Sequence, residues 1–399
     1  MVTFDEALHI VLDAAQTKEA LPDEKCEVVS LEDVCGRILQ QTVVADRDMP
    51  PFDKSAMDGY ACLYSDIVAE IPMRLLETIP AGSVALHEIA SGVCSKIMTG
   101  AALPLGADYV LMIEDAKEKD GFVIPMGEPK RKSNISHQGE DLTAGTEVFA
   151  PGCIIQPQHV AVLAAVGCTK IRVAKRVRVG IISTGDELTE PWDAPERVHI
   201  RNSNGWQLLA QSKKAGVLAT YYGIARDCEE SFAPLLSKAI KENDVVVVSG
   251  GVSMGDFDIV PETARNLGID ILFDRVAVQP GKPTTFGVGP NGFFFGLPGN
   301  PVSSFIQFEL MVKPFLMRLM GAHYVPVSFR LPLAHPYARK QAERMAHLPA
   351  TIDPSGSCFL LNYHGSGHIN SLQQANCLAR IPLGVTFVAT GEPVEIILL

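Results

Sequence analysis

The hydrophobic pattern changes character several times along the chain. Near the N-terminus, Thr3 and Glu6 have the spacing of a capping box, which predicts the start of a helix. The apolar residues of this predicted helix fall on one face: Phe4, Leu8, Val11 and Leu12. Residues 25–45 then carry short apolar runs of mixed period, and a later apolar stretch, residues 151–165, is expected to pack back on this helix.

Two regions have the pattern of small β domains. From Met49 to about Phe149, short alternating strands are separated by many turns, and no long helical pattern is present. After Gly321 the chain again consists of short apolar strands, and it ends in PVEIILL. We therefore expect a β-rich domain before the middle of the chain and a barrel-like β domain at its end.

Between residues 176 and 320, apolar strands alternate with amphipathic helices. The expected strands are 177–183, 217–225, 244–251, 270–278 and 292–297, and the expected helices are 204–215, 229–242, 261–267 and 301–320. This alternation predicts a parallel sheet with right-handed crossovers. The predicted fold class is thus a multidomain α/β protein. Its expected domains are 1–45 plus 142–175 (discontinuous), 46–141 (β-rich), 176–324 (α/β) and 325–399 (C-terminal β).

Three loops follow predicted strands of the α/β region. They read STGDEL (residues 183–188), SGGVSMGDFD (residues 249–258) and GLPGNP (residues 296–301). Glycine lets a backbone approach a ligand closely, and the start of a following helix points free N–H groups at an anion. Ligands of parallel sheets bind beyond the carboxyl ends of the strands. The sequence therefore predicts one binding site made from all three loops.

Acidic residues in and near these loops indicate a metal ion. A carboxylate about 4 Å from a phosphate charge is repelled by about 4 kcal/mol at an effective dielectric constant of 20, which would cancel several hydrogen bonds of ~1 kcal/mol each. The acids concerned are Asp186, Glu187, Asp227 and Asp258. Either Mg²⁺ bridges them to phosphate or they contact another part of the ligand. Because Mg²⁺ typically binds one or two carboxylates plus substrate phosphates, we favour the metal.

Each loop also has a purely structural interpretation. Acids after Gly185 would favour the N-terminus of a following helix, and Pro301 suits the first turn of a helix. Taken alone, Asp186 and Glu187 fit the structural interpretation better. The glycines of SGGVSMGDFD exceed what a turn needs, so a function is the better interpretation there, although the loop fits neither a P-loop nor a dinucleotide fingerprint.

Composition excludes several classes of protein. The net charge of −12 argues against nucleic acid as the main partner, because such binding depends on Lys and Arg. The nine cysteines show no metal-ligand spacing, which indicates reduced thiols in a cytosolic protein. No apolar run reaches the ~18 residues of a membrane span, and the N-terminus lacks the basic region of a signal peptide. We expect a soluble, cytoplasmic protein with no membrane partner.

Further motifs lie outside the α/β region. They include PPFDKSAMDGYA (residues 50–61), IMTGA (residues 97–101) and RKSNISHQGEDL (residues 131–142), each of which on its own chemistry is more simply a turn. Together with STGDEL, the RD of GIARD, SGGVSMGDFD, QPGKP, GLPGNPVSS and GSGHINSLQQAN, they occur in a specific order. In this order the whole chain resembles the molybdopterin molybdenumtransferase (molybdenum insertase) family, which includes bacterial MoeA and the gephyrin E domain.

The resemblance implies a molybdopterin-binding type of α/β domain and an insertase activity. Such relatives use Mg²⁺, insert molybdate into adenylylated molybdopterin and release AMP. They are homodimers whose active site lies between subunits, and the discontinuous N-terminal domain serves as linker and dimerisation domain. The resemblance further implies contacts with molybdopterin adenylyltransferase and with acceptor molybdoenzymes.

The resemblance also implies roles for individual residues. Asp58, Thr99 and Asp141 from one subunit, with Asp186 and Glu187 from the other, would be catalytic. Metal ligands would be Asp186, Glu187 and Asp258. Substrate-binding residues would be Ser183, Thr184, Gly185, Asp227, Gly250, Gly251, Ser253, Asp258, Arg275, Lys282, Pro298, Asn300, Pro301, Ser303 and Ser366.

Two departures from the family pattern matter. Cys228 follows Asp227 where relatives often have a second acid, so only Asp227 is assigned. Gln279 stands where some relatives have lysine, and Arg275 is expected to supply that charge.

Two other functions stay open from the sequence. The α/β domain resembles molybdopterin adenylyltransferase, but that activity would not require the other two-thirds of the chain. A non-catalytic molybdopterin-binding scaffold is the third class, and the lack of long linkers gives it little support.

Overall fold

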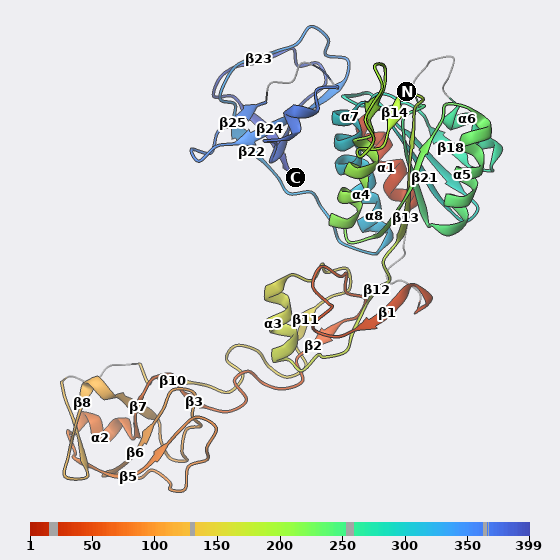
Figure 1. The fold of residues 1–399 in the computed structure, drawn as a ribbon. Coiled ribbons are helices and arrows are strands. Elements are labelled where there is room, and N and C mark those ends of the chain that lie inside the picture. Colours follow the sequence, from red (N-terminus) through yellow and green to blue (C-terminus); the bar gives the residue numbers. More distant parts are fainter. Residues whose placement is uncertain (16–22, 128–131, 253–258, 362–364, 366) are drawn as a thin grey trace. The chain divides into compact units, whose positions relative to one another are not determined.

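A computed structural model of the chain describes residues 1–15, 23–127, 132–252, 259–361, 365 and 367–399 (Figure 1). They form two compact units. Unit 1 consists of Met1–Gln41, Pro151–Gln156 and Lys170–Leu399, and unit 2 consists of Thr42–Ala150 and Pro157–Thr169. Each unit is discontinuous in sequence. The finer division into four domains remains a prediction.

A mixed six-stranded sheet forms the centre of unit 1. Its strands, in spatial order, are β16 (Leu218–Ala225), β13 (Arg178–Thr184), β17 (Val245–Ser249), β21 (Gly292–Leu297), β20 (Thr285–Gly289) and β18 (Asp270–Phe273). The first four are mutually parallel, as expected. The expectation of a wholly parallel sheet is wrong, because β20 is antiparallel to both of its neighbours. Only Pro290 and Asn291 separate β20 from β21, and so short a connection requires antiparallel pairing.

Helices cover both faces of this sheet (Figure 1). They are α4 (Asn204–Lys214), α5 (Glu229–Glu242), α6 (Val260–Asn266), α7 (Pro301–Gln307) and α8 (Lys313–Leu319). The helix expected over 301–320 is interrupted by a π-helical segment, η3 (Phe308–Val312). Alternate residues of β17 enter opposite cores: Val245 and Val247 face one cluster, while Val246 and Val248 pack with α5 and α6 residues. This double burial explains the uninterrupted apolar run of β17.

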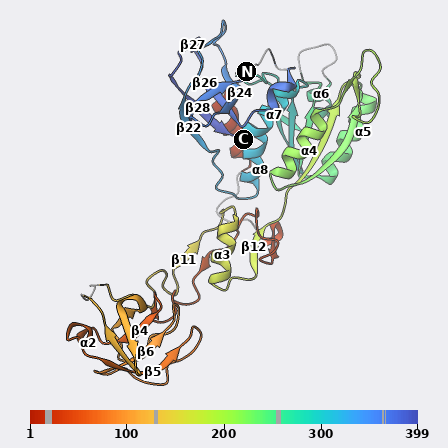
Figure 2. The ribbon, with the colours of Figure 1, turned by 60° about the vertical axis from the view of Figure 1, so that its left-hand side comes forward.

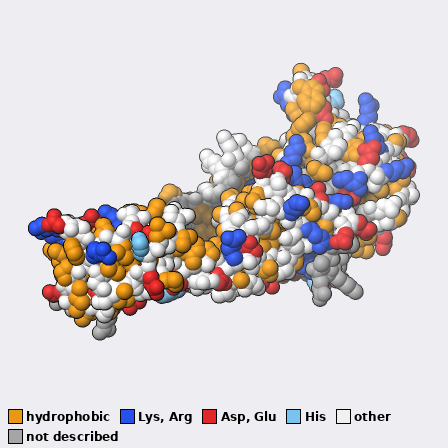
Figure 3. Space-filling model, turned by 90° about the horizontal axis from the view of Figure 1, so that it is seen from below, with side chains coloured by type: hydrophobic (Ala, Val, Ile, Leu, Met, Phe, Trp, Pro, Cys, Tyr) orange, Lys and Arg blue, Asp and Glu red, His pale blue; other side chains and the backbone are white. Residues whose placement is uncertain are grey.

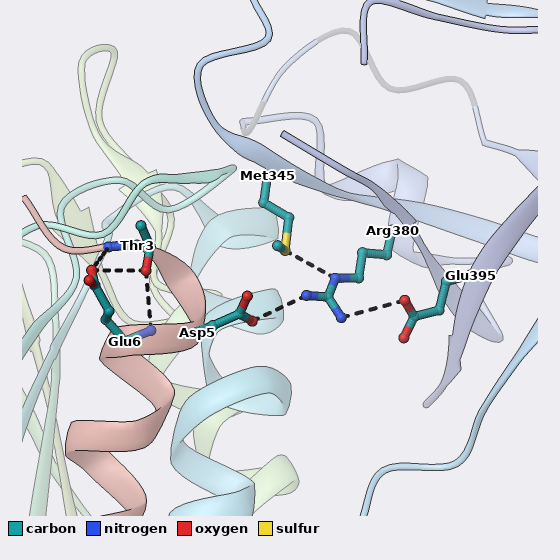
Figure 4. Close-up of polar contacts among 6 residues, drawn as sticks. All are labelled: Thr3, Asp5, Glu6, Met345, Arg380 and Glu395. Carbon is teal, nitrogen blue, oxygen red and sulfur yellow. Dashed lines mark hydrogen bonds and ion pairs between the residues drawn. The ribbon is translucent and has the colours of Figure 1, made fainter. Parts of the chain in front are cut away.

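The N-terminal helix α1 (Phe4–Ala14) begins with the expected capping box. The Glu6 amide donates to Thr3 Oγ1 at 3.2 Å, and the Thr3 amide donates to Glu6 Oε2 at 2.8 Å (Figure 4). The helix packs against α8 of unit 1. Of the stretch 151–165 expected to pack with it, Pro151–Gln156 belongs to the same unit and Ile154 packs against the same core cluster, whereas α3 (Pro157–Ala165) belongs to unit 2. Helical periodicity identified the apolar face but carries no information about which element covers it.

A second β sheet is built mainly from strands that follow α8, with β19 from an earlier segment. Its strands are β19 (Val278–Gln279), β24 (Met345–Ile352), β26 (Cys377–Ile381), β28 (Pro393–Leu398) and β22 (Ser328–Pro332), with β25 (Cys358–Leu360) paired to β24. The guanidinium of Arg380 donates to Asp5 of α1 at 3.2 Å and to Glu395 at 3.4 Å (Figure 4). The expected C-terminal β structure is present, and it is joined to the first helix by this shared ion pair.

Smaller elements complete unit 1. They are the pairs β1 (Cys26–Val29) with β12 (Ile171–Ala174), β14 (Leu188–Thr189) with β15 (Ile200–Arg201), and β23 (Tyr337–Ala338) with β27 (Phe387–Val388), and the short helices η1 (Asp23–Lys25) and η4 (Ile369–Leu372). The pairing of β1 with β12 brings residues before and after unit 2 together.

Unit 2 is β-rich, as expected (Figure 2). Its main sheet has the order β7 (Tyr109–Met112), β4 (Gly59–Cys62), β6 (Val93–Ile97), β5 (Met73–Ile79), β9 (Phe122–Pro125) and β8 (Ala116–Lys119). Shorter pairs are β3 (Lys54–Ser55) with β10 (Ile135–Ser136) and β2 (Val43–Val44) with β11 (Glu147–Phe149). Besides α3, its described residues form only the short helices α2 (Tyr64–Val68) and η2 (Ile113–Asp115).

Two surface properties bear on function. No helix among the described residues is both long enough and apolar enough to cross a bilayer. On the face seen in Figure 3, acidic and basic side chains are interspersed.

Candidate active site

The three glycine-bearing loops lie together at the carboxyl ends of β13, β17 and β21. Ser183 is level with Ser249, and Ser249 with Leu297, so the three strands end side by side. A cleft of ≈ 480 Å³ opens at these ends. Of the residues expected to bind substrate or metal, it is lined by Ser183, Thr184, Gly185, Glu187, Asp227, Gly250, Gly251, Pro298, Asn300 and Pro301. The described parts of the three loops therefore line one cleft, as expected from their positions after parallel strands.

Gly250 and Gly251 allow the loop after β17 to pack against the end of β13. Gly250 has φ +99°, and a Cβ there would lie 2.3 Å from the carbonyl oxygen of Thr184. Gly251 has φ +61°, and its Cβ would lie 2.8 Å from a methyl group of Val260. Both the backbone conformation and the close approach exclude a side chain. These glycines thus shape the floor of the cleft.

Of the predicted acids, Glu187 and Asp227 line the cleft, whereas Asp186 does not line it but is hydrogen-bonded to Asp227. Asp186 and Asp227 exchange hydrogen bonds: the Asp227 amide donates to Asp186 Oδ1 at 3.2 Å, and the Asp186 amide donates to Asp227 Oδ2 at 3.4 Å. The Glu187 carboxylate folds over Gly185, where a Cβ would lie 2.7 Å from Glu187 Oε2. The described residues contain no group of three or more His, Cys, Asp or Glu side chains able to hold a metal by themselves.

Three predicted site residues lie outside the described residues: Ser253, Asp258 and Ser366. The assignment of metal ligands therefore stays a prediction. Of the three predicted ligands, only Asp186 and Glu187 lie among the described residues.

Two asparagines that the sequence analysis did not assign are central to the cleft. The Asn204 amide donates to Ser249 Oγ and to the Gly299 carbonyl oxygen, both at 2.7 Å. Asn202 Oδ1 accepts from Ser183 Oγ at 3.2 Å and from the Gly205 amide at 3.1 Å. Both asparagines lie in RNSNG, where the short strand β15 ends and α4 begins. A run of polar residues between a strand and a helix is the sequence signal that could have identified them.

Asn202 continues into an aromatic network beside the cleft. Its amide donates to the Tyr221 hydroxyl at 2.6 Å, and that hydroxyl donates to Glu190 at 2.8 Å. The Trp206 indole donates to the other oxygen of Glu190 at 3.1 Å. Burial and the neighbouring Glu190 raise the pKa of Tyr221, so its hydroxyl remains a hydrogen-bond donor at neutral pH.

A second cavity of ≈ 860 Å³ adjoins the cleft. Both are lined by Pro283, Pro298 and Asn300. Its cationic side chains are Lys282 of QPGKP and Arg344, which comes from the segment before β24. The predicted residue Ser303 also lines it. The cleft, whose charged lining residues are Glu187, Asp227 and Arg201, thus adjoins a space with two positive charges.

The second cavity is lined by Arg344, which the sequence analysis did not assign, and not by Arg275, which it did. The guanidinium of Arg339 donates to the backbone oxygens of Arg344, Val385 and Pro382, at 2.8, 2.7 and 2.6 Å, and so fixes the segment that carries Arg344. Arg275, the expected source of charge, lines neither the cleft nor the second cavity, and its backbone oxygen accepts a hydrogen bond from the Val2 amide. A role for Arg275 in binding stays a prediction.

The predicted catalytic residues of unit 2 fall into two groups. Asp58 Oδ1 accepts hydrogen bonds from the Thr99 amide at 2.7 Å and from Thr99 Oγ1 at 2.8 Å. These two bonds hold the pKa of Asp58 below its usual value, so this exposed carboxylate is ionised at neutral pH. Asp141 lines a different cavity, of ≈ 590 Å³, together with Lys54 and Glu140. The structure therefore pairs Asp58 with Thr99 and leaves Asp141 apart from them.

A ligand cleft beyond adjacent parallel strands, with helices on both faces of the sheet, defines an α/β ligand-binding enzyme domain carried within a larger chain. Comparison with known families is more specific. The MoeA N-terminal region (domain I and II) matches residues 2–167, the probable molybdopterin binding domain matches residues 180–318, and the MoeA C-terminal region (domain IV) matches residues 323–399.

Whole-chain relatives agree with these matches. A molybdopterin molybdenumtransferase of Staphylococcus aureus strain MRSA252 is 35% identical over 98% of this chain and 94% of its own length. One from Staphylococcus epidermidis is 35% identical over 93% and 90%. The crystal structure of a molybdopterin biosynthesis moeA protein from Pyrococcus horikoshii OT3 superposes with a TM-score of 0.86 at 31% identity, covering 100% of both chains.

The chain therefore belongs to the molybdopterin molybdenumtransferase (MoeA) family. It is a transferase of molybdenum cofactor biosynthesis. The resemblance inferred from the ordered motifs is confirmed.

The packing of Gly250 against Thr184 can be tested by substitution. Gly250→Ala should destabilise unit 1 by about 1–3 kcal/mol more than Gly223→Ala, because the new Cβ would collide with the Thr184 carbonyl group. Gly223 is a matched control: its φ is +103° and a Cβ there would meet nothing within 4 Å. Thermal unfolding of both variants measures the difference. Equal destabilisation would show that backbone conformation alone, and not close packing, requires Gly250.

Proposed function

We propose that this chain inserts molybdenum from molybdate into adenylylated molybdopterin, with Mg²⁺, and releases AMP. The observation that supports this most is that a cleft with a mainly acidic charged lining adjoins a cavity with a basic one. The cleft is lined by Asp227, Glu187 and Arg201, and the second cavity by Lys282 and Arg344. A substrate with both a nucleotide phosphate and an incoming oxyanion requires such a division of charge.

Asp186 and Asp227 are the carboxylates that best suit Mg²⁺. Their reciprocal hydrogen bonds hold the two side chains next to each other, and among the residues that this structure describes no third acid completes a metal cage. This donor set fits Mg²⁺, which takes one or two carboxylates and completes its shell with phosphate oxygens and water. When bound, the cation would neutralise phosphate charge as AMP departs.

The second cavity suits molybdate. A compact dianion is stabilised by charge-assisted hydrogen bonds, and Lys282, Arg344 and Ser303 provide donors of this kind. The three hydrogen bonds from Arg339 hold the backbone around Arg344, which reduces the entropy lost when the side chain engages an anion. The residues shared with the cleft would let the oxyanion approach the pterin sulfurs directly.

In the proposed reaction, the backbone and side chains of this chain mainly bind and orient the substrate, the cation and the oxyanion. The glycine loops would let the substrate approach the ends of β13 and β17, and Asp186 and Asp227 would hold the cation, which would supply positive charge for the phosphates. Lys282 and Arg344 position the oxyanion. Molybdenum's soft ligands are the substrate's own sulfurs, so the chain does not need a cysteine cluster.

The central test supplies adenylylated molybdopterin, molybdate and Mg²⁺, and measures released AMP and metal bound to the pterin product. We expect wild-type turnover that chelation of Mg²⁺ abolishes. Asp186→Asn should lower the rate at least about a hundredfold, because a charged metal ligand is lost.

The matched control for this test is Asp270→Asn. Asp270 is an exposed carboxylate at the start of β18, at the other end of the sheet from the cleft. Its substitution should leave the rate unchanged. Normal AMP release by Asp186→Asn, or release that persists after chelation, would contradict the metal assignment.

The oxyanion assignment predicts a selective defect. Lys282→Ala should raise the molybdate concentration for half-maximal rate about 10–100-fold, since a charge-assisted hydrogen bond contributes about 1.5–3 kcal/mol. The concentration dependence on adenylylated molybdopterin should change much less. Lys241→Ala, an exposed lysine at the end of α5, is the control. A Lys282→Ala enzyme with unchanged molybdate dependence would place the oxyanion elsewhere.

We also propose that the chain acts as a homodimer in which Asp58, Thr99 and Asp141 of one copy complete the cleft of another. The family resemblance supports this arrangement. If so, inactive Asp58→Asn and Asp186→Asn proteins, unfolded together and refolded, should recover about a quarter of wild-type turnover, because half of the random dimers contain one intact site out of two. No recovery in a mixture shown to exchange subunits would mean that each site is built from one copy.

A further inference from the structure

Asn204, which lines the cleft, has a buried hydrogen-bond acceptor with no partner among the described residues. Asn204 lines the cleft and is only 8% exposed. Its Oδ1 atom is buried and accepts no hydrogen bond from any described residue. Buried polar atoms in folded proteins are nearly always paired, so an unpaired one in a ligand cleft calls for an explanation.

Chemistry fixes which amide atom is unpaired. The nitrogen of an asparagine amide donates and its oxygen only accepts. The atom next to Gly299 lies 2.7 Å from a backbone carbonyl oxygen, which cannot donate, so this atom must be Nδ2. The same nitrogen donates to Ser249 Oγ at 2.7 Å. Both N–H groups are therefore used, and rotating the amide by 180° would set two oxygens against each other.

A neighbouring asparagine shows that this arrangement is specific to position 204. Asn202 lines the same cleft, yet its oxygen accepts two hydrogen bonds and its nitrogen donates to Tyr221. A second unpaired atom points to a ligand independently: Thr184 Oγ1, on a side chain only 4% exposed, also lines the cleft without a partner among the described residues.

We infer that Asn204 Oδ1 accepts a hydrogen bond from an exocyclic amino group on a heterocycle of the substrate. The inference rests on the proposed function and deepens it. An unpaired carbonyl oxygen repels phosphate and molybdate, so the group it receives must be a donor. The same cleft is lined by the apolar side chains of Val252 and Pro298, which suit the faces of a flat ring. Both the adenine and the pterin of an adenylylated pterin carry such an amino group.

The test compares ligands that differ only in the amino group. Binding of AMP is compared with that of purine riboside 5′-monophosphate, and binding of pterin with that of pteridin-4-one, by calorimetry on the full chain. We expect the wild type to prefer the amino-bearing member of one pair about tenfold, the range expected for one neutral hydrogen bond to a buried partner. The pair that shows the preference identifies which ring Asn204 recognises.

Two variants assign that preference to Asn204. Asn204→Ala should reduce the ratio within that pair to about one, and this ratio is informative even if overall affinity falls, because both ligands are compared on the same protein. Asn243→Ala is the matched control. Asn243 is also buried, and its amide donates to Tyr222 and Ala239, but it precedes β17 at the opposite end of the sheet from the cleft. This variant should keep the wild-type ratio.

The outcomes separate this inference from the proposed function. A wild type that binds both members of each pair equally would overturn the role of Asn204, independently of how the variants fold, and leave the insertase proposal standing. A preference that persists in Asn204→Ala would do the same. A wild type that binds neither AMP nor pterin would overturn both.

Discussion

The Asn204 side chain donates to Ser249 and to Gly299, and the geometry of the candidate active site depends on this pair of hydrogen bonds. They join the start of α4 to the end of β17 and to the loop between β21 and α7. The three segments come from well-separated parts of the sequence, and each bears residues of the cleft. Because the Asn204 amide connects all three segments, replacing this residue would remove these hydrogen bonds and disturb the relative placement of the loops.

Close packing at Gly250 reinforces the same arrangement. The loop after β17 lies against the Thr184 carbonyl group, where no side chain fits, so the end of β13 and the end of β17 act as one surface. Helices bury both faces of the sheet, which leaves the ends of its strands as the place where polar groups can meet a ligand. The location of the chemistry thus follows from how the sheet is buried.

Charge is divided between the two adjoining spaces. Asp186 and Asp227 face each other through reciprocal hydrogen bonds at the cleft, while Lys282 and Arg344 line the cavity beyond Pro298 and Asn300. This division fits a transferase of molybdenum cofactor biosynthesis, the class to which the family matches assign the chain. It would let one protein bind a phosphate-bearing substrate through a cation and an oxyanion through its own positive charges.

The sequence alone determined what depends on neighbours along the chain. Period-two and period-3.6 patterns located most strands and helices of the α/β region, the Thr3–Glu6 spacing gave the cap of α1, and glycine-rich loops after apolar strands located the cleft. Ordered motifs gave the family. Only the tertiary structure decided what depends on distant residues. It reverses β20, packs α1 on α8, places Arg344 in the same cavity as Lys282, and leaves Asn204 Oδ1 without a partner among the described residues. The physical reason is that a local pattern records whether a side chain is buried, whereas its partner is chosen by how segments far apart in sequence pack together.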